Sequence, residues 1–174
     1  MNNKKINTSK EIERKYLIEM PDTGLLESLE GATITQITQT YLTIKNFAVR
    51  RVRKSVRGGV TRYIYNEKTP LSHLTRIERE AEITEAGYIE LLKEADPSLS
   101  TIIKTRYAVP FMGYVYEIDI FDFSVSKAIM EVELPNSRAI PPLPYFVKVI
   151  REVTKEKGYT NYEIAKSIPA ELTL

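Results

Sequence analysis

The sequence predicts a mainly β protein of the α+β class, in which eight antiparallel strands close into a barrel with peripheral helices. About eight segments alternate apolar and polar residues with the two-residue period of a strand. Most of these segments are separated by hairpin-length connections, which favours antiparallel pairing. Eight such strands are enough to close a small barrel, or tunnel.

Composition places the whole chain, residues 1–174, in one domain. A hydrophobic content of 43% and a charged content of 28% are typical of a globular protein with a single core. The net charge of +2 provides no basic field for nucleic acid or a membrane surface. No apolar run approaches the roughly 20 residues of a membrane span, and the polar stretch 1–10 is unlike a secretory signal, so we expect a cytoplasmic protein.

Turn and breaker residues separate the predicted strands. Gly58-Gly59 is a strong hairpin signal, and Pro70 and Gly113 interrupt other alternating segments. The proline cluster that starts at Pro135 fits no central strand. The predicted strands cover residues 11–18, 35–45, 48–55, 61–68, 75–83, 101–109, 113–123 and 127–134.

Three helices are predicted outside the strands. A short helix follows Pro21-Asp22 and ends near Gly31. A second begins after Thr84, a plausible N-cap, and runs through Ala95. Thr160, with Glu163 three residues later, forms a capping box for the third helix, which Pro169 stops.

Several kinds of catalytic centre are excluded or disfavoured by composition. The chain has no cysteine, which removes disulfides, thiolate nucleophiles and Cys-ligated zinc. Its single histidine, His73, lies in a predicted loop, so a His-based triad or zinc site is not expected. Any metal ion would be a hard cation such as Mg²⁺ or Mn²⁺, held by carboxylate oxygens.

Pairs of like charges at positions i and i+2 recur in six of the predicted strands. Residues at this spacing share one face, where like charges repel each other. We interpret the pattern as an acidic and a basic zone that face each other inside the barrel, filled by divalent cations and a polyanion. The pairs are Glu11/Glu13, Arg51/Arg53, Glu78/Glu80, Lys104/Arg106, Glu117/Asp119 and Glu131/Glu133.

A phosphate chain is the natural polyanion for the basic zone. Arg51, Arg53 and Arg106 are able to grip phosphate oxygens bidentately. Lys15, Lys68 and Lys104 would act as point charges. Gly58-Gly59 lacks the Lys-Ser/Thr of a Walker loop, so recognition would rely on side chains. The alternative, an exposed RNA-binding strip at 50–57, lacks interleaved aromatic residues.

The ordered motifs resemble the CYTH superfamily, the triphosphate tunnel metalloenzymes. Glu11-Ile12-Glu13-Arg14-Lys15 resembles the Glu-x-Glu-x-Lys signature of that family. The chain is most similar to the short bacterial inorganic triphosphatases, although Tyr145-Phe146-Val147 stands where those members often have a tryptophan. The further matches, in family order, are Gln39-Thr40-Tyr41-Leu42, Arg51-Val52-Arg53, Lys68, Arg76-Ile77-Glu78-Arg79-Glu80, Lys104-Thr105-Arg106-Tyr107, Glu117-Ile118-Asp119-Ile120-Phe121 and Glu131-Val132-Glu133.

The resemblance implies metal-dependent hydrolysis of inorganic triphosphate, and of nucleoside triphosphates as a variant. Glu78 and Glu80 would hold a second metal ion or orient the attacking water, and together with Lys15 they form the expected catalytic set. The phosphate-binding residues would be Lys15, Arg51, Arg53, Lys68, Lys104 and Arg106. The metal ligands for Mg²⁺ or Mn²⁺ would be Glu11, Glu13, Asp119, Glu131 and Glu133.

Three other functions stay open at this point. A class IV adenylate cyclase would use the same charges but needs a purine pocket, and a thiamine triphosphatase needs an aromatic clamp. A polyphosphate-binding module without catalysis would keep the basic residues and could lose the acidic ones. The expected partner is a small-molecule triphosphate, without nucleic acid or membrane, and the sequence leaves a homodimer open.

Overall fold

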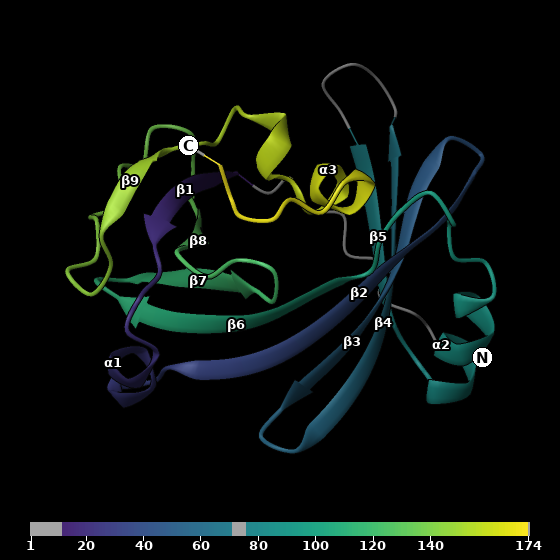
Figure 1. Cartoon of the computed structure of the whole chain (residues 1–174), viewed down its shortest axis with the longest axis horizontal. Helices are drawn as coiled ribbons and strands as arrows, with labels where there is room; N and C mark the ends of the chain where they lie inside the picture. Colours follow the sequence, from purple (N-terminus) through teal and green to yellow (C-terminus); the bar gives the residue numbers. More distant parts are fainter. Residues whose placement is uncertain (1–11, 71–75, 174) are drawn as a thin grey trace.

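The computed structural model describes residues 12–70 and 76–173 of the chain. Nearly all of the regular structure is β (Figure 1). The strands are β1 Glu13–Glu19, β2 Thr33–Lys45, β3 Ala48–Arg57, β4 Val60–Pro70, β5 Arg76–Ile83, β6 Ile102–Phe111, β7 Tyr114–Phe121, β8 Lys127–Glu133 and β9 Val149–Glu152. The helices are α1 Thr23–Ser28, α2 Glu85–Leu92, the 3-10 turn η1 Lys157–Tyr159 and α3 Asn161–Lys166.

The strands form one antiparallel sheet in the order β5-β4-β3-β2-β6-β7-β8-β1-β9. The mainly β class is therefore confirmed, but the predicted closed eight-stranded barrel is not. Closure would need β1 to pair with β5, and β1 instead pairs with β8 on one side and with β9 on the other. Within the described residues, β5 and β9 are the two edges of an open sheet.

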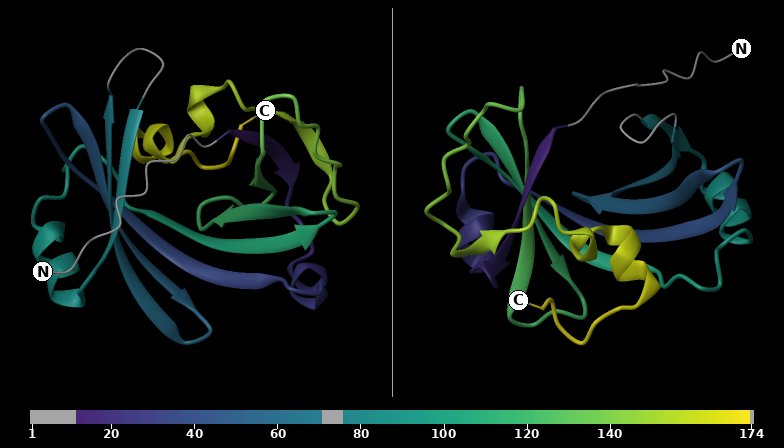
Figure 2. Two further views of the ribbon diagram at one scale, coloured as in Figure 1. Left: turned by 180° about the vertical axis from the view of Figure 1, so that it is seen from behind. Right: turned by 90° about the horizontal axis from the view of Figure 1, so that it is seen from above.

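The sheet is strongly curved and has an inner and an outer face. Figures 1 and 2 show β2–β5 as one arm and β6–β9 with β1 as the other, with α3 lying between the arms. The two-residue period puts alternate residues of each strand on the inner face. Among the described residues, the inner face therefore carries the predicted pairs Arg51/Arg53, Lys104/Arg106, Glu117/Asp119 and Glu131/Glu133.

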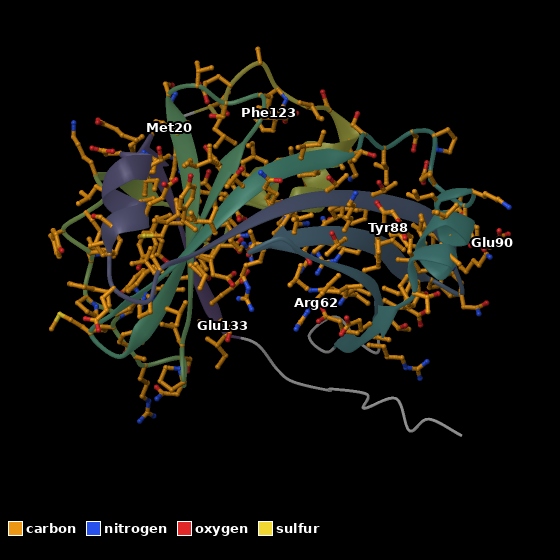
Figure 3. The ribbon with its side chains drawn as sticks, turned by 90° about the horizontal axis from the view of Figure 1, so that it is seen from below. Met20, Arg62, Tyr88, Glu90, Phe123 and Glu133 are labelled. Carbon is orange, nitrogen blue, oxygen red and sulfur yellow. The ribbon has the colours of Figure 1, made fainter. Side chains whose placement is uncertain are left out.

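The outer face is covered by two short helices. Leu26 of α1 packs with Tyr107 and Tyr116 in one buried apolar cluster. Tyr88 of α2 packs with Leu42 and Val52 in another. Figure 3 shows Tyr88 directed toward the sheet, whereas Glu90 of the same helix points away from it. Apolar packing outside the sheet leaves the inner face available for charged residues.

The C-terminal segment closes one end of the inner face. Ile164 and Ala165 of α3 pack with Leu17, Tyr41 and Ile102 in one buried apolar cluster. Leu17 and Ile102 stand two residues from Lys15 and Lys104 and share their face of the sheet. Half of the predicted capping box is confirmed, because the Thr160 hydroxyl accepts a hydrogen bond from the backbone N–H of Glu163. The other half is not formed: the backbone N–H of Thr160 donates to the Lys157 carbonyl, and the Glu163 carboxylate accepts from Lys166. The end of the inner face next to α3 is therefore apolar, and the charged residues lie beyond it along the strands.

Most predicted elements agree with the structure. Gly58 and Gly59 both have positive φ in the β3–β4 hairpin, a conformation that glycine adopts at little cost. The second helix ends at Leu92, earlier than predicted. β9 was not predicted. No helix in the described part of the chain is both long enough and apolar enough to cross a membrane.

Candidate active site on the inner face

Asp119 is the centre of the buried charges on the inner face. It lies on β7, is 1% exposed, and accepts hydrogen bonds from two neighbours on β6. Arg106 binds it bidentately, with Nε 2.6 Å and Nη2 2.7 Å from its two oxygens, and Lys104 donates to one of the same oxygens. Residues two apart on β6 have side chains on the same face, so Lys104 and Arg106 can both bind the same carboxylate.

Burial and charge act in opposite directions on these three groups. Burial alone would raise the pKa of Asp119, but Lys104 and Arg106 hold it well below its usual range. Burial lowers the pKa of Lys104 to about 8, and Arg106 adds to this effect while Asp119 opposes it. For Arg106 the attraction of Asp119 outweighs burial and raises the pKa.

A second ion pair joins β1 to β8. Lys15 Nζ lies 2.5 Å from one oxygen of Glu131, its partner across the two strands. Burial opposes the charge of Lys15, but the Coulombic attraction and hydrogen bond of Glu131 raise its pKa. Glu131 also lies 3.3 Å from Arg106 Nη2, so this pair is connected to the Asp119 cluster.

The other arm contributes Arg51 and Arg53 from β3. Both are half-buried on the inner face. Burial, together with the nearby charges of Arg51 and Arg106, lowers the pKa of Arg53 to about 10. The negative charges of Glu80, on the same arm, and of Asp119, on the other arm, act to raise the pKa of Arg53. Charges on both arms therefore influence Arg53. Lys68 of β4 is half-buried and is paired in register with Val49.

The predicted acidic residues of β5 and of the N-terminus are described only in part. Glu80 is exposed and accepts a hydrogen bond from Asn66 of β4 at 3.5 Å. The backbone of Glu78 is paired with Lys68, but its side chain is not described. Glu11 lies outside the described residues, as does His73. The assigned roles of Glu11, Glu78 and Glu80 therefore stay predictions.

Four carboxylates surround one pocket of about 500 Å³ at the end of the inner face opposite α3. Glu13 and Glu133 are directly opposed across β1 and β8, and their like charges repel each other. Lys15, whose Nζ lies 3.8 Å from Glu13, offsets part of this repulsion. Figure 3 shows Glu133 on one side of the space between the arms and Arg62 on the other. The lining residues are Glu13, Gly113, Tyr114, Val115, Glu117, Glu131, Glu133 and Pro135.

The donor set of this pocket fits Mg²⁺ or Mn²⁺ in its chemistry, since both ions prefer carboxylate oxygens. Within the described residues no three carboxylates already converge into a cluster that could hold a metal ion. Both oxygens of Asp119 accept hydrogen bonds from Lys104 or Arg106, so in this structure Asp119 serves as their counter-ion. Its assignment as a metal ligand stays a prediction, as do those of Glu13, Glu131 and Glu133.

Glu117, to which the sequence analysis assigned no catalytic, phosphate-binding or metal-binding role, is part of the site. Its carboxylate forms an ion pair with Arg106 Nη1 and lines the acidic pocket. Burial raises the pKa of Glu117, and the charge of Arg106 opposes this rise. Its position two residues before Asp119 on β7 was the available sequence signal.

Four more polar residues reach the inner face without having been assigned to the site. Gln39 and Tyr41 of β2 are buried opposite Arg53 and Arg51, and the sequence signals were their shared strand parity and the motif Gln39-Thr40-Tyr41-Leu42. Asn66 of β4 is 2% exposed and contacts Glu80. Asn161 of α3 accepts a hydrogen bond from Lys104 at 3.3 Å. No local pattern could reveal this last contact, because it depends on how the C-terminal segment folds back.

The fold of this curved antiparallel sheet, with its charged inner face, is shared with solved structures of other proteins. No family model and no curated protein match the sequence. A solved structure described as the inorganic triphosphatase NE1496 superposes with a TM-score of 0.61 at 27% identity, covering 94% of this chain and 99% of that chain. A second structure, described as the hypothetical protein NE1496, gives 0.60 at 28% identity and covers 92% and 100%.

These comparisons confirm the resemblance to the CYTH superfamily that the motifs predicted, and within it to the short bacterial inorganic triphosphatases. The fold is shared more widely. The PH1819 protein from Pyrococcus horikoshii OT3 has a TM-score of 0.52 at 21% identity, covering 73% of this chain and 80% of that chain.

Proposed function

We propose that the protein hydrolyses inorganic triphosphate in a reaction that depends on Mg²⁺ or Mn²⁺. The observation that carries the proposal is the cluster of cations around one buried carboxylate. Lys104 and Arg106 both bind Asp119. The charge of Arg106 also lowers the pKa of Arg53 on the opposite arm, so the basic residues of the two arms influence each other. Similarity to an inorganic triphosphatase over nearly the whole of both chains supports the same reaction class.

The basic residues would bind and orient the phosphate chain. Arg51, Arg53 and Arg106 present planar forks that match phosphate oxygens, and the lysines add point charges. Arg106 is already held by Asp119, Glu117 and Glu131, so its guanidinium is fixed before a substrate arrives. Such preorganised charge stabilises the negative charge that develops in phosphoryl transfer. The full proposed set is Lys15, Arg51, Arg53, Lys68, Lys104 and Arg106.

The acidic pocket would hold the metal ion. Glu13, Glu131 and Glu133 supply its carboxylates, with Glu11 and Asp119 as further proposed ligands. A bound divalent cation neutralises phosphate charge and favours ionisation of water. Glu80, on the other arm, would orient the attacking water, or contribute to a second metal site with Glu78. Water would attack a terminal phosphorus in line as its phosphoanhydride bond breaks, so the proposed products of inorganic triphosphate are phosphate and pyrophosphate.

The experiment that tests this function is phosphate release from four substrates, with Mg²⁺, Mn²⁺ or a chelator. The substrates are inorganic triphosphate, ATP, pyrophosphate and thiamine triphosphate, and cyclic AMP is measured in parallel. Fast, metal-dependent release from inorganic triphosphate supports the proposal. Cyclic AMP formation would assign a cyclase, and preferred release from thiamine triphosphate would assign a thiamine triphosphatase. Tight binding without turnover would leave a polyphosphate-binding module.

A cytoplasmic location is proposed from the sequence alone.

A further inference from the structure

Three buried side-chain atoms on the inner face have no hydrogen bond among the described residues: Oε1 of Gln39 and the Nε atoms of Arg51 and Arg53. The Gln39 oxygen can only accept a hydrogen bond, and the two arginine atoms can only donate one. Of the two arginines, Arg53 is the one paired directly with Gln39 across β2 and β3, whereas Arg51 is paired with Tyr41. Paired residues on one face of a sheet have Cβ atoms roughly 4.5–5.5 Å apart, within reach of a contact between these two long side chains.

The orientation of the Gln39 amide follows from both of its neighbours: the Tyr41 hydroxyl can donate or accept, but the Arg53 guanidinium can only donate. Gln39 is completely buried, and its Nε2 donates to the Tyr41 hydroxyl at 3.2 Å. The Tyr41 hydroxyl also takes part in a hydrogen bond with Arg51. Because arginine has only donors, the amide oxygen is the only end of Gln39 that complements Arg53. A flipped amide would direct its NH₂ group at a guanidinium.

The energetic cost of leaving these atoms unpaired favours an interaction between them. A buried donor or acceptor without a partner costs roughly 1–3 kcal/mol. One hydrogen bond, made directly or through a single buried water, satisfies both atoms. Arg53 has a particular need for this acceptor, because burial and the nearby Arg51 and Arg106 disfavour its charge. A neutral acceptor meets that need without adding a negative charge that would repel phosphate.

We propose that Gln39 is a positioning residue that couples the two arginines of β3. In this arrangement its carbonyl would accept from Arg53 Nε, directly or through one buried water, because neither atom has another partner among the described residues. Its Nε2 donates to the Tyr41 hydroxyl, which is hydrogen-bonded to Arg51. The side chain thereby fixes the spacing of two guanidiniums and leaves their terminal nitrogens available for phosphate oxygens. This inference rests on the proposed function, because it treats Arg51 and Arg53 as phosphate-binding residues.

The contact itself is testable by NMR on the intact protein without any substrate. The measurement is the exchange rate with water of the Arg53 Nε proton, assigned by its loss in Arg53→Lys. We expect slow exchange in the wild type and exchange accelerated about tenfold or more in Gln39→Met, which has a similar shape but no acceptor. Gln36→Met is the matched control, because Gln36 is exposed on the same strand. Equal exchange rates in wild type and Gln39→Met would overturn the proposal.

Its effect on the site is testable by calorimetry with inorganic triphosphate as the probe. We expect Gln39→Met to weaken binding about tenfold in the wild-type background and less than about twofold in Arg53→Lys, because interacting residues are non-additive. Equal losses in both backgrounds would overturn the positioning role. Gln39→Glu keeps the acceptor, so the Arg53 proton should still exchange slowly, but its negative charge should weaken triphosphate binding. This variant replaces Gln39→Met in the test if Gln39→Met does not fold.

If the wild type fails to bind triphosphate, the proposed function fails, but the NMR measurement still decides whether Gln39 and Arg53 interact.

Discussion

Replacing Asp119 with asparagine removes the negative charge that binds both Lys104 and Arg106. The side chains of Lys104 and Asp119 are 2% and 1% exposed, and Arg106 contacts both Asp119 oxygens at 2.6 and 2.7 Å. Asparagine keeps one acceptor oxygen and directs an NH₂ group toward a cation. Breaking a buried ion pair by removing one partner costs about 3–5 kcal/mol, a large part of the roughly 5–15 kcal/mol that stabilises a typical domain.

The assay is thermal unfolding of wild type, Asp119→Asn and the control Asp122→Asn, whose residue is exposed one position after β7. For a protein of this size each kcal/mol corresponds to roughly 2–4 °C in Tm, so Asp119→Asn should lower Tm by roughly 6–20 °C. Asp122→Asn should leave Tm within about 2 °C. A Tm for Asp119→Asn within about 2 °C of the wild type would refute the reasoning that Asp119 neutralises the cluster.

The pH dependence provides an independent check on the same charge. The pKa of Asp119 in the folded protein lies well below its usual range, because Lys104 and Arg106 outweigh the effect of burial. The stabilisation is therefore complete above the unfolded pKa of about 3.9 and is lost as pH falls toward the folded value. The Tm difference between wild type and Asp119→Asn should be constant from about pH 6 to 7.5 and shrink below about pH 4. An undiminished difference at lower pH would show that shape, and not charge, is responsible.

Two further predictions concern residues away from the inner face. The Glu171 carboxylate accepts hydrogen bonds from Ser124 and from both the backbone and the hydroxyl of Ser126, and these bonds overcome burial to lower its pKa to about 2. Its stabilisation is present above about pH 4.3 and lost as pH falls toward 2, so Glu171→Gln should reduce stability to chemical denaturation at pH 7 but not at pH 2. On the outer face, Arg50 donates to Tyr65 and Glu94 at 2.9 and 2.7 Å. Arg50→Lys should lose one of these bonds and lower Tm by roughly 2–6 °C without changing the Michaelis constant for triphosphate, and a changed constant would contradict a purely structural role.

The strands and their inner faces were predictable because each segment carries its own two-residue period. That period alone was enough to assign the members of each pair, Arg51/Arg53 and Lys104/Arg106, to the same face of their strand. β9 was not predictable, since four residues after a proline-rich stretch become a strand only by pairing with β1. The same pairing uses the edge of β1 that barrel closure would require. Closure is therefore decided by tertiary contacts that no single segment encodes.

The candidate site was predictable in its residue types but less so in its contacts. Strand parity indicated that Asp119 and Glu131 face the same interior as the cations. It could not show that Arg106 would donate hydrogen bonds to both oxygens of Asp119. Because of these bonds, Asp119 is a counter-ion in this structure. Asn161 was beyond prediction, because its contact with Lys104 depends on the path of the whole C-terminal segment.

The most direct test of triphosphate hydrolysis is the rate of phosphate release by Glu131→Gln with saturating Mg²⁺. Glu131 lies 2.5 Å from Lys15, lines the acidic pocket and is a proposed metal ligand. Glutamine keeps its shape but removes the charge, so we expect turnover to fall at least about 100-fold. Glu90→Gln, on the outer side of α2, should retain the wild-type rate. Release by folded Glu131→Gln at the wild-type rate would contradict the assignment of the acidic pocket to metal-dependent catalysis.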